Sequence, residues 1–166
     1  MGRDGGEIGF KFEGLVISVD LPNFLFWTVN GDRFKDTRID VDAVLMDGSS
    51  NDNFGVICRF QDNSNFYGFL ISHDGYYGIF KMLEGTMILF SSDGELKFSE
   101  AIRQGGVVNH IQTVCQGDIL TLIVNDTLLS EVKDASFDAG QIGMIAGAYE
   151  NPGVKILFDN LKVSQP

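Results

Sequence analysis

Histidine, cysteine and basic residues are scarce in this chain of 166 residues. It contains two histidines, two cysteines and three prolines, and its 12 Lys and Arg against 23 Asp and Glu give a net charge of −11. Nucleic-acid phosphates and anionic lipid surfaces would repel such a protein, so functions on those partners are disfavoured. The isolated histidines, His73 and His110, have no evident triad partner, and zinc sites usually need more His and Cys.

Long hydrophobic runs are also missing. No apolar run approaches the roughly 20 residues of a membrane span, so membrane insertion is not expected. Residues 1–7 contain no apolar segment, so we expect no signal peptide there but a flexible start. Residues 8–166 have the length of one domain. We expect an extracellular or cell-surface domain cut from a longer exported protein, with a cytoplasmic protein as the alternative.

What the chain does contain is phenylalanine, glycine and alternation of period two. It has 14 Phe and 20 Gly, which suit pleated strands joined by tight turns. In residues 53–60, Phe54, Val56, Cys58 and Phe60 fall on one face, with Ile57 and Arg59 on the other. Counting such runs predicts about eleven to thirteen strands and under about 8% helix. We therefore predict an all-β fold of two packed antiparallel sheets.

Several short sequence segments occur in a recognisable order between about Val41 and Val163. They are Phe54-Gly55-Val56-Ile57-Cys58-Arg59-Phe60, Asn65-Phe66-Tyr67-Gly68-Phe69, Asp74-Gly75-Tyr76-Tyr77, Leu120-Thr121-Leu122-Ile123-Val124-Asn125, Gly140-Gln141-Ile142-Gly143 and Phe158-Asp159-Asn160-Leu161. The chain thereby resembles the concanavalin A-like lectin and glucanase superfamily, and looks closest to bacterial domains related to family 16 glycoside hydrolases and laminin G modules. The resemblance implies a jelly-roll sandwich with one concave sheet. It also implies sugar binding on that sheet and, in many members, a structural Ca²⁺.

The catalytic motif of the family 16 enzymes, Glu-x-Asp-x-x-Glu, is absent. Its bulged strand would place three acids on one face, so that one carboxyl attacks while another donates a proton. Ile39-Asp40-Val41-Asp42 is the nearest match, and it lacks both Glu. We therefore expect a non-catalytic extracellular binding or adhesion module, with carbohydrate as the favoured ligand and another surface protein as a second partner. The alternatives are a structural or self-assembling unit of a larger surface protein, or a diverged glycoside hydrolase.

A sugar-binding face needs aromatic rings and hydrogen-bonding groups on one surface. Five residues are our candidates for ligand binding, and Trp27 is a further candidate for stacking on a sugar ring. The five are Arg59, Phe66, Tyr76, Phe80 and Tyr149. The alternative is that these residues belong to the sandwich core or to plain exposed surface.

The two cysteines lie on apolar strand faces, 57 residues apart. An even count on core faces suits a Cys58–Cys115 disulfide in an exported domain. The alternative is a pair of buried free thiols packed as small hydrophobic residues.

Asp159 marks a break in the last strand. The apolar residues Val154, Ile156 and Phe158 stand at even-numbered positions, whereas Leu161 and Val163 stand at odd-numbered ones. This change predicts a bulge at Asp159-Asn160. If the carboxylate turns inward it needs a partner, and the resemblance implies Ca²⁺ held with backbone carbonyls. The alternative is that Asp159 accepts hydrogen bonds from backbone amides. The loop of residues 47–53 is a second place for Ca²⁺, although its composition also suits an ordinary turn.

Overall fold

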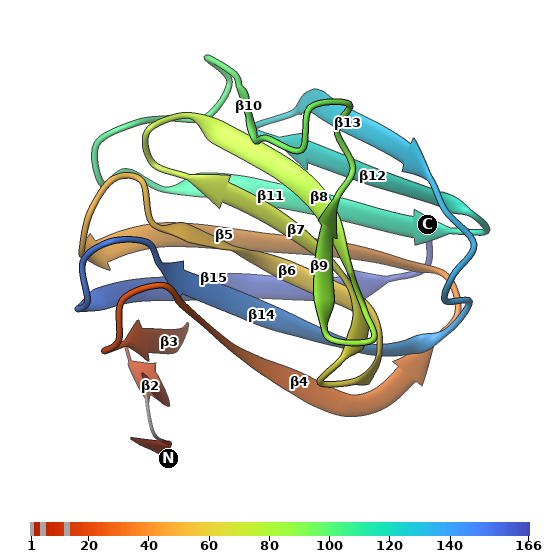
Figure 1. Ribbon diagram of the computed structural model, residues 1–166, viewed down its shortest axis with the longest axis horizontal. Coiled ribbons are helices and arrows are strands. Elements are labelled where there is room, and N and C mark those ends of the chain that lie inside the picture. Colours follow the sequence, from red (N-terminus) through yellow and green to blue (C-terminus); the bar gives the residue numbers. More distant parts are fainter. Residues whose placement is uncertain (1, 4–5, 12–13) are drawn as a thin grey trace.

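Two antiparallel sheets pack face to face in the computed structural model, which describes residues 2–3, 6–11 and 14–166 (Figure 1). Strands account for 66% of the chain, and the described part contains no helix. The predicted fold class is therefore confirmed. Of the flexible start expected over residues 1–7, Met1, Asp4 and Gly5 lie outside the described residues. The others belong to the first two strands, and the domain boundary stays a prediction.

The first sheet, called sheet A, has eight strands in the order β1-β2-β3-β15-β5-β11-β12-β13. Their bounds are β1 Gly2–Arg3, β2 Gly6–Lys11, β3 Gly14–Val19, β15 Val154–Ser164, β5 Thr37–Asp47, β11 Asn109–Gln116, β12 Ile119–Val124 and β13 Thr127–Lys133. The second sheet, called sheet B, has the order β10-β8-β7-β6-β14-β4, and β9 pairs with β8. Its bounds are β10 Lys97–Phe98, β8 Tyr76–Leu83, β7 Asn65–Ser72, β6 Asn53–Asp62, β14 Gly140–Ala148, β4 Phe24–Phe34 and β9 Thr86–Leu89.

The core between the sheets follows the period-two pattern. Ile39, Val41 and Ala43 of β5 face inward, as do Val56 and Cys58 of β6. The Cys58–Cys115 disulfide expected from the sequence is present and joins β6 of sheet B to β11 of sheet A. The two Cα atoms lie 6.9 Å apart, just beyond the usual range of about 4.4–6.8 Å. The sheets are thus linked covalently through their central strands.

The strand β6 does not keep its pleat to the end. Arg59 has φ of 50°, and the pairing of β6 with β7 shifts register after Cys58. Such a bulge reverses which side the following residue faces. Phe60 consequently packs with Ile57 on the outer side of sheet B, so the prediction that Phe60 shares the face of Val56 and Cys58 is wrong.

The guanidinium of Arg59 lies inside the sandwich and is 2% exposed. Its Nε donates to the carbonyl of Lys35 at 3.0 Å, and its Nη1 donates to the carbonyls of Gly117 and Phe137 at 2.6 and 3.0 Å. Nη2 is 3.3 Å from a carboxylate oxygen of Asp36. A buried charge requires such partners. Arg59 therefore fastens three connecting segments together, and its buried position does not support the prediction that it binds a ligand.

Candidate functional site

The outer face of sheet B is built from bulky apolar residues that alternate with glycine across neighbouring strands. One cross-strand row is Val29, Gly143, Ile57, Gly68 and Phe80, and the adjacent row is Trp27, Ile145, Gly55, Leu70 and Gly78. Glycine is required where a ring lies flat on its neighbour. A Cβ on Gly68 would stand 2.2 Å from two ring atoms of Phe80. The alternation therefore lets large side chains lie down on the sheet.

Trp27 closes this face from the edge strand β4. Its ring centroid lies 5.3 Å from that of Phe66 in β7, and its indole N–H donates to the side-chain oxygen of Asn63 at 3.2 Å. Three strand spacings of about 4.8 Å separate β4 from β7 in a flat sheet. The two long side chains reach toward each other across β14 and β6, and we call this outer side of sheet B the concave face. In Figure 1 the connection between β6 and β7 approaches the lower bend of β4.

Two predicted ligand residues form the bed beneath Trp27. Phe66 and Phe80 are 0% exposed, with ring centroids 5.9 Å apart, and Phe60 lies 5.5 Å from Phe66. Leu89 of β9 packs against this bed from the opposite edge of the sheet. Phe66 and Phe80 lie on the expected face, but both are fully buried, with Phe66 against Trp27 and Phe80 against Phe66, and neither can touch a ligand without movement.

Polar side chains with planar groups lie where β6 turns into β7, and one of them, Asn63, accepts from the indole of Trp27. Asn63 and Gln61 are exposed, and Nη2 of Arg33 donates to Oε1 of Gln61 at 3.2 Å. The amide nitrogen of Gln61 donates in turn to the carbonyls of Arg59 and Ala139. These hydrogen bonds hold Arg33 and Gln61 in place, two residues along the chain from Asn63 and its contact with the indole.

The two other predicted ligand residues are exposed at the opposite end of sheet B. Tyr76 is 42% exposed and makes an edge contact with Phe98, at 5.7 Å between ring centroids. Tyr149 is 51% exposed and follows β14. The N–H of Tyr149 donates to Asp52 at 2.9 Å, and its carbonyl accepts from the N–H of Asn23 at 2.6 Å. The structure brings neither of them to Trp27.

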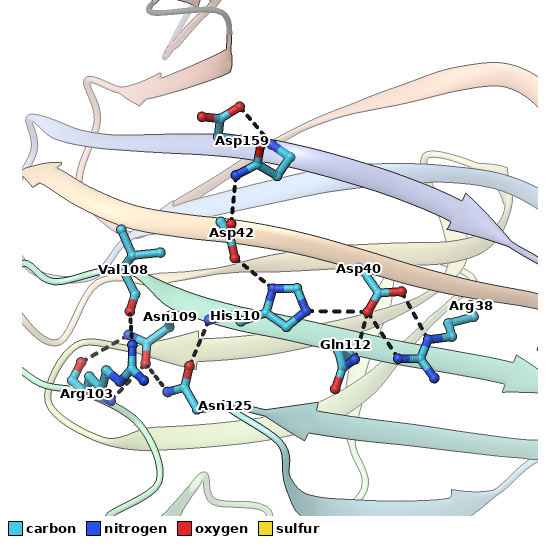
Figure 2. Close-up of polar contacts among 11 residues, drawn as sticks. Arg38, Asp40, Asp42, Arg103, Val108, Asn109, His110, Gln112, Asn125 and Asp159 are labelled. Atoms are coloured by element: carbon cyan, nitrogen blue, oxygen red, sulfur yellow. Dashed lines mark hydrogen bonds and ion pairs between the residues drawn. The ribbon is translucent and has the colours of Figure 1, made fainter.

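The outer face of sheet A is polar, in contrast to the concave face (Figure 2). Arg38 binds both carboxylate oxygens of Asp40, at 3.0 and 3.2 Å, and Gln112 donates to Asp40 at 2.7 Å. Partial burial alone would raise the pKa of Asp40. The hydrogen bonds from Arg38, Gln112 and His110 outweigh burial and lower the pKa.

The same network continues through His110 to the last strand (Figure 2). Nδ1 of His110 donates to Asp42 at 2.7 Å, and the other carboxylate oxygen of Asp42 accepts from the amide of Asn160 at 2.8 Å. Asp159 accepts from the backbone N–H of Asn160 at 2.7 Å, and the pairing of β15 with β5 shifts register between Asp159 and Lys162. The predicted bulge is confirmed.

The carboxylate of Asp159 does not turn into the core, because the residue is partly exposed and its recorded partner is a backbone amide. Among the side chains that the structure describes, no group of three His, Cys, Asp or Glu is placed to hold a metal ion. In the loop of residues 47–53, Asp52 accepts from the N–H groups of Ser49 and Tyr149. Calcium at Asp159 or in this loop stays a prediction.

Comparison with known proteins shows what this arrangement of sheets is similar to. No protein-family model matches the chain, and no curated protein sequence matches it. Among solved structures, the carbohydrate-binding module CBM66 from Bacillus subtilis has 18% sequence identity and a TM-score of 0.78, over 96% of this chain and 92% of that one. CG-16, a homodimeric agglutinin from chicken liver, has 14% identity and a TM-score of 0.59, over 85% of this chain and 100% of that one. The chain has the concanavalin A-like jelly-roll fold.

The jelly roll also matches part of a larger enzyme. A sialidase has 10% identity and a TM-score of 0.68, and the match covers 98% of this chain but 16% of that one. Within the described residues, no helix of this jelly roll is long and apolar enough to cross a membrane.

Sequence reasoning missed the two arrangements that distinguish the faces of this jelly roll. Trp27 was a minor candidate because its partner Asn63 lies 36 residues away, and no local pattern links them. The network on sheet A joins three strands that are far apart in the sequence. The alternation of Arg38, Asp40 and Asp42 was the signal that could have placed them on one outer face.

Proposed function

We propose that this domain is a non-catalytic carbohydrate-binding module that binds sugars on its concave face beside Trp27. The observation that carries the proposal is a partly exposed indole that packs on the buried Phe66 ring and donates to Asn63, with Gln61 and Arg33 hydrogen-bonded to each other beyond the same turn. An aromatic ring offers an apolar surface to the C–H groups of a sugar, and planar amide and guanidinium groups suit its hydroxyls. The similarity in fold to a carbohydrate-binding module and an agglutinin supports this assignment.

A non-catalytic role is supported by the state of the two neighbouring carboxylates on sheet A. A glycosidase needs a general acid whose pKa is raised towards neutrality. Hydrogen bonds from Arg38, Gln112 and His110 instead lower the pKa of Asp40, and Asp42 is engaged by His110 and Asn160. Turnover of aryl glycosides that is lost in Asp40→Asn would overturn this part of the proposal.

An extracellular or cell-surface location is part of the same proposal. A disulfide between the central strands of the two sheets is typical of proteins that fold in an oxidising compartment. Two titratable thiols in protein isolated from its natural source without reductant would contradict it.

The test begins with a glycan array and continues with titration of the bound sugar. Trp27 is the single tryptophan, so a change in tryptophan emission reports the proposed site directly. Trp27→Ala should weaken binding by at least about 10-fold, because buried aromatic anchors dominate binding energy. Leu161→Ala is the matched control, since Leu161 is 51% exposed on sheet A. Binding to no glycan, or equal binding by the Trp27→Ala variant with an unchanged fold, would refute the proposal.

A further inference from the structure

A pocket of about 650 Å³ lies at the end of the sandwich where β4 of sheet B leads into β5 of sheet A. Figure 1 shows this end on the right. The lining comes from the end of β4, the connection from β4 to β5, the end of β11, and the end of β15 with the two residues that follow it. Residues from both sheets therefore surround one hollow.

Two cationic side chains line this pocket. Arg33 and Lys35 are exposed, and neither joins an ion pair within the part of the chain that the structure describes. Nη2 of Arg33 donates to the neutral side chain of Gln61, which leaves the charge of the guanidinium uncompensated. Other cations of the protein, such as Lys81 and Lys97, are paired with carboxylates. The pocket therefore holds positive charge that is available to a ligand.

The negative groups of the pocket do not neutralise these two cations. Asp36 is the acidic side chain in the lining, and its Oδ1 accepts from Nη2 of the buried Arg59 at 3.3 Å and from the N–H of Gly117 at 3.0 Å. Among the ion pairs of the described residues, none joins the α-carboxylate of Pro166 to either cation. The chain carries a net charge of −11, but at physiological salt exposed charges act over only about 8 Å. The local charge therefore decides what this pocket attracts.

Neutral hydrogen-bond donors complete the lining. The side chains of Gln116, Ser164 and Gln165 are at least partly exposed, and none of the three is bonded to another described residue. Amide and hydroxyl groups donate to anionic oxygens, and a guanidinium presents a planar fork to two oxygens of the same group. This set of donors matches a small group with two or more negatively charged oxygens.

We infer that this pocket binds one oxyanion group, a carboxylate, sulfate or phosphate, with Arg33 and Lys35 as its charged donors. The inference goes beyond the proposed function, because it needs no contact with the indole of Trp27. The ligand carries a single such group, since a polyanion would still meet the negative charge of the rest of the surface.

The experiment is an NMR titration of the backbone amides at physiological ionic strength. The probes are inorganic sulfate, inorganic phosphate, and the matched sugars glucuronate and glucose, which differ in one carboxylate. We expect saturable shifts in residues 33–36, 116 and 163–165 with the oxyanions, and no shift there with glucose. Shifts with glucuronate alone would assign the pocket to acidic sugars, and shifts with the inorganic ions as well would assign it to oxyanions in general.

Matched variants test whether the two cations carry the binding. Lys35→Gln and Arg33→Gln should each weaken oxyanion binding by about 5-fold or more, because each removes a charged donor. Lys155→Gln removes the same charge from an exposed position at the start of β15, outside the pocket, and should change binding by less than about 2-fold.

The outcomes separate this inference from the proposed function. No saturable shift with any of the three oxyanions overturns the inference, and so do equal losses in Lys35→Gln and Lys155→Gln, because the effect would then come from net charge. Neither result bears on the binding of neutral sugars beside Trp27. Conversely, a glycan array without binding refutes the proposed function and leaves the oxyanion pocket in place.

Discussion

The two outer faces of the sandwich differ in how they deal with water. The concave face of sheet B covers its apolar bed with its own side chains, so that Ile57, Phe66 and Phe80 are fully buried although no further layer of the described residues packs there. The outer face of sheet A stays polar and satisfies Asp40 and Asp42 through Arg38, Gln112, His110 and Asn160. One face removes apolar side chains from water, while the other keeps its charged side chains in place by hydrogen bonds.

The largest expected effect is on the apolar bed. Phe80→Ala should lower the free energy of unfolding by about 3–5 kcal/mol, because it removes a fully buried ring and leaves a cavity. Phe98→Ala is the control on the same sheet, since its ring is 52% exposed, and it should cost about 1 kcal/mol or less. Urea denaturation measures both. Similar losses for the two variants would mean that the concave face is open in solution.

The alternation of bulky residues with glycine makes a second test. Gly68→Ala should destabilise by about 1–3 kcal/mol, because its methyl group would overlap the Phe80 ring. Phe80→Leu in the same chain should recover part of that loss, which a double-mutant cycle detects. Gly31→Ala in β4 is the control, because a Cβ there meets nothing within 4 Å. Equal effects at positions 68 and 31 would contradict the packing described for this face.

A smaller, pH-dependent effect is expected between the two sheets. His73 is buried, and its Nε2 accepts from the N–H of Leu45 at 2.9 Å. Burial lowers the pKa of His73, and the backbone carbonyl of Arg103 opposes this only in part. Because the folded pKa lies below the unfolded value of about 6.5, the contribution is present above that pH and is lost as pH falls below it.

Melting temperatures measured between neutral and mildly acidic pH check this expectation. His73→Gln removes the titrating group and should flatten the profile over that range. A profile that keeps the same shape in the variant would assign the pH dependence to other groups.

The smallest effects should come from the polar face. Asp42→Asn should change the free energy of unfolding by about 1 kcal/mol or less, as is usual for exposed ion pairs.

The calcium prediction belongs to the same face: chelator should lower the melting temperature if Asp159 holds Ca²⁺, and Asp159→Ala should abolish the difference. Equal melting curves in Ca²⁺ and in chelator would decide for the backbone contact with Asn160 alone.

The fold could be predicted from the sequence because its signals are local. Alternation identifies strands, and Asp74-Gly75 identifies a hairpin where glycine takes φ of 98°. The sequence also predicts the bulge at Asp159-Asn160, since the apolar positions change from even to odd numbers within a few residues. Each of these features depends on near neighbours in the chain.

The site could not be predicted as well, because it depends on which strands become neighbours. Arg59 looks like a polar group on a strand surface, yet its partners Lys35, Gly117 and Phe137 lie far from it in the sequence. The bulge of β6 at Arg59 moves Phe60 to the concave face. Phe66 and Phe80 lie on the expected face, but Phe66 is covered by Trp27 of β4, a strand that is far from it in the sequence.

The disulfide has a further consequence for the integrity of the chain. Cys58 and Cys115 enclose the connection from β9 to β10, where Asp93 and Gly94 are exposed. A protease that cuts between Asp93 and Gly94 would produce two fragments still joined through sulfur, each retaining strands of both sheets. The domain can therefore be nicked at this connection without coming apart, and the pieces separate only after reduction.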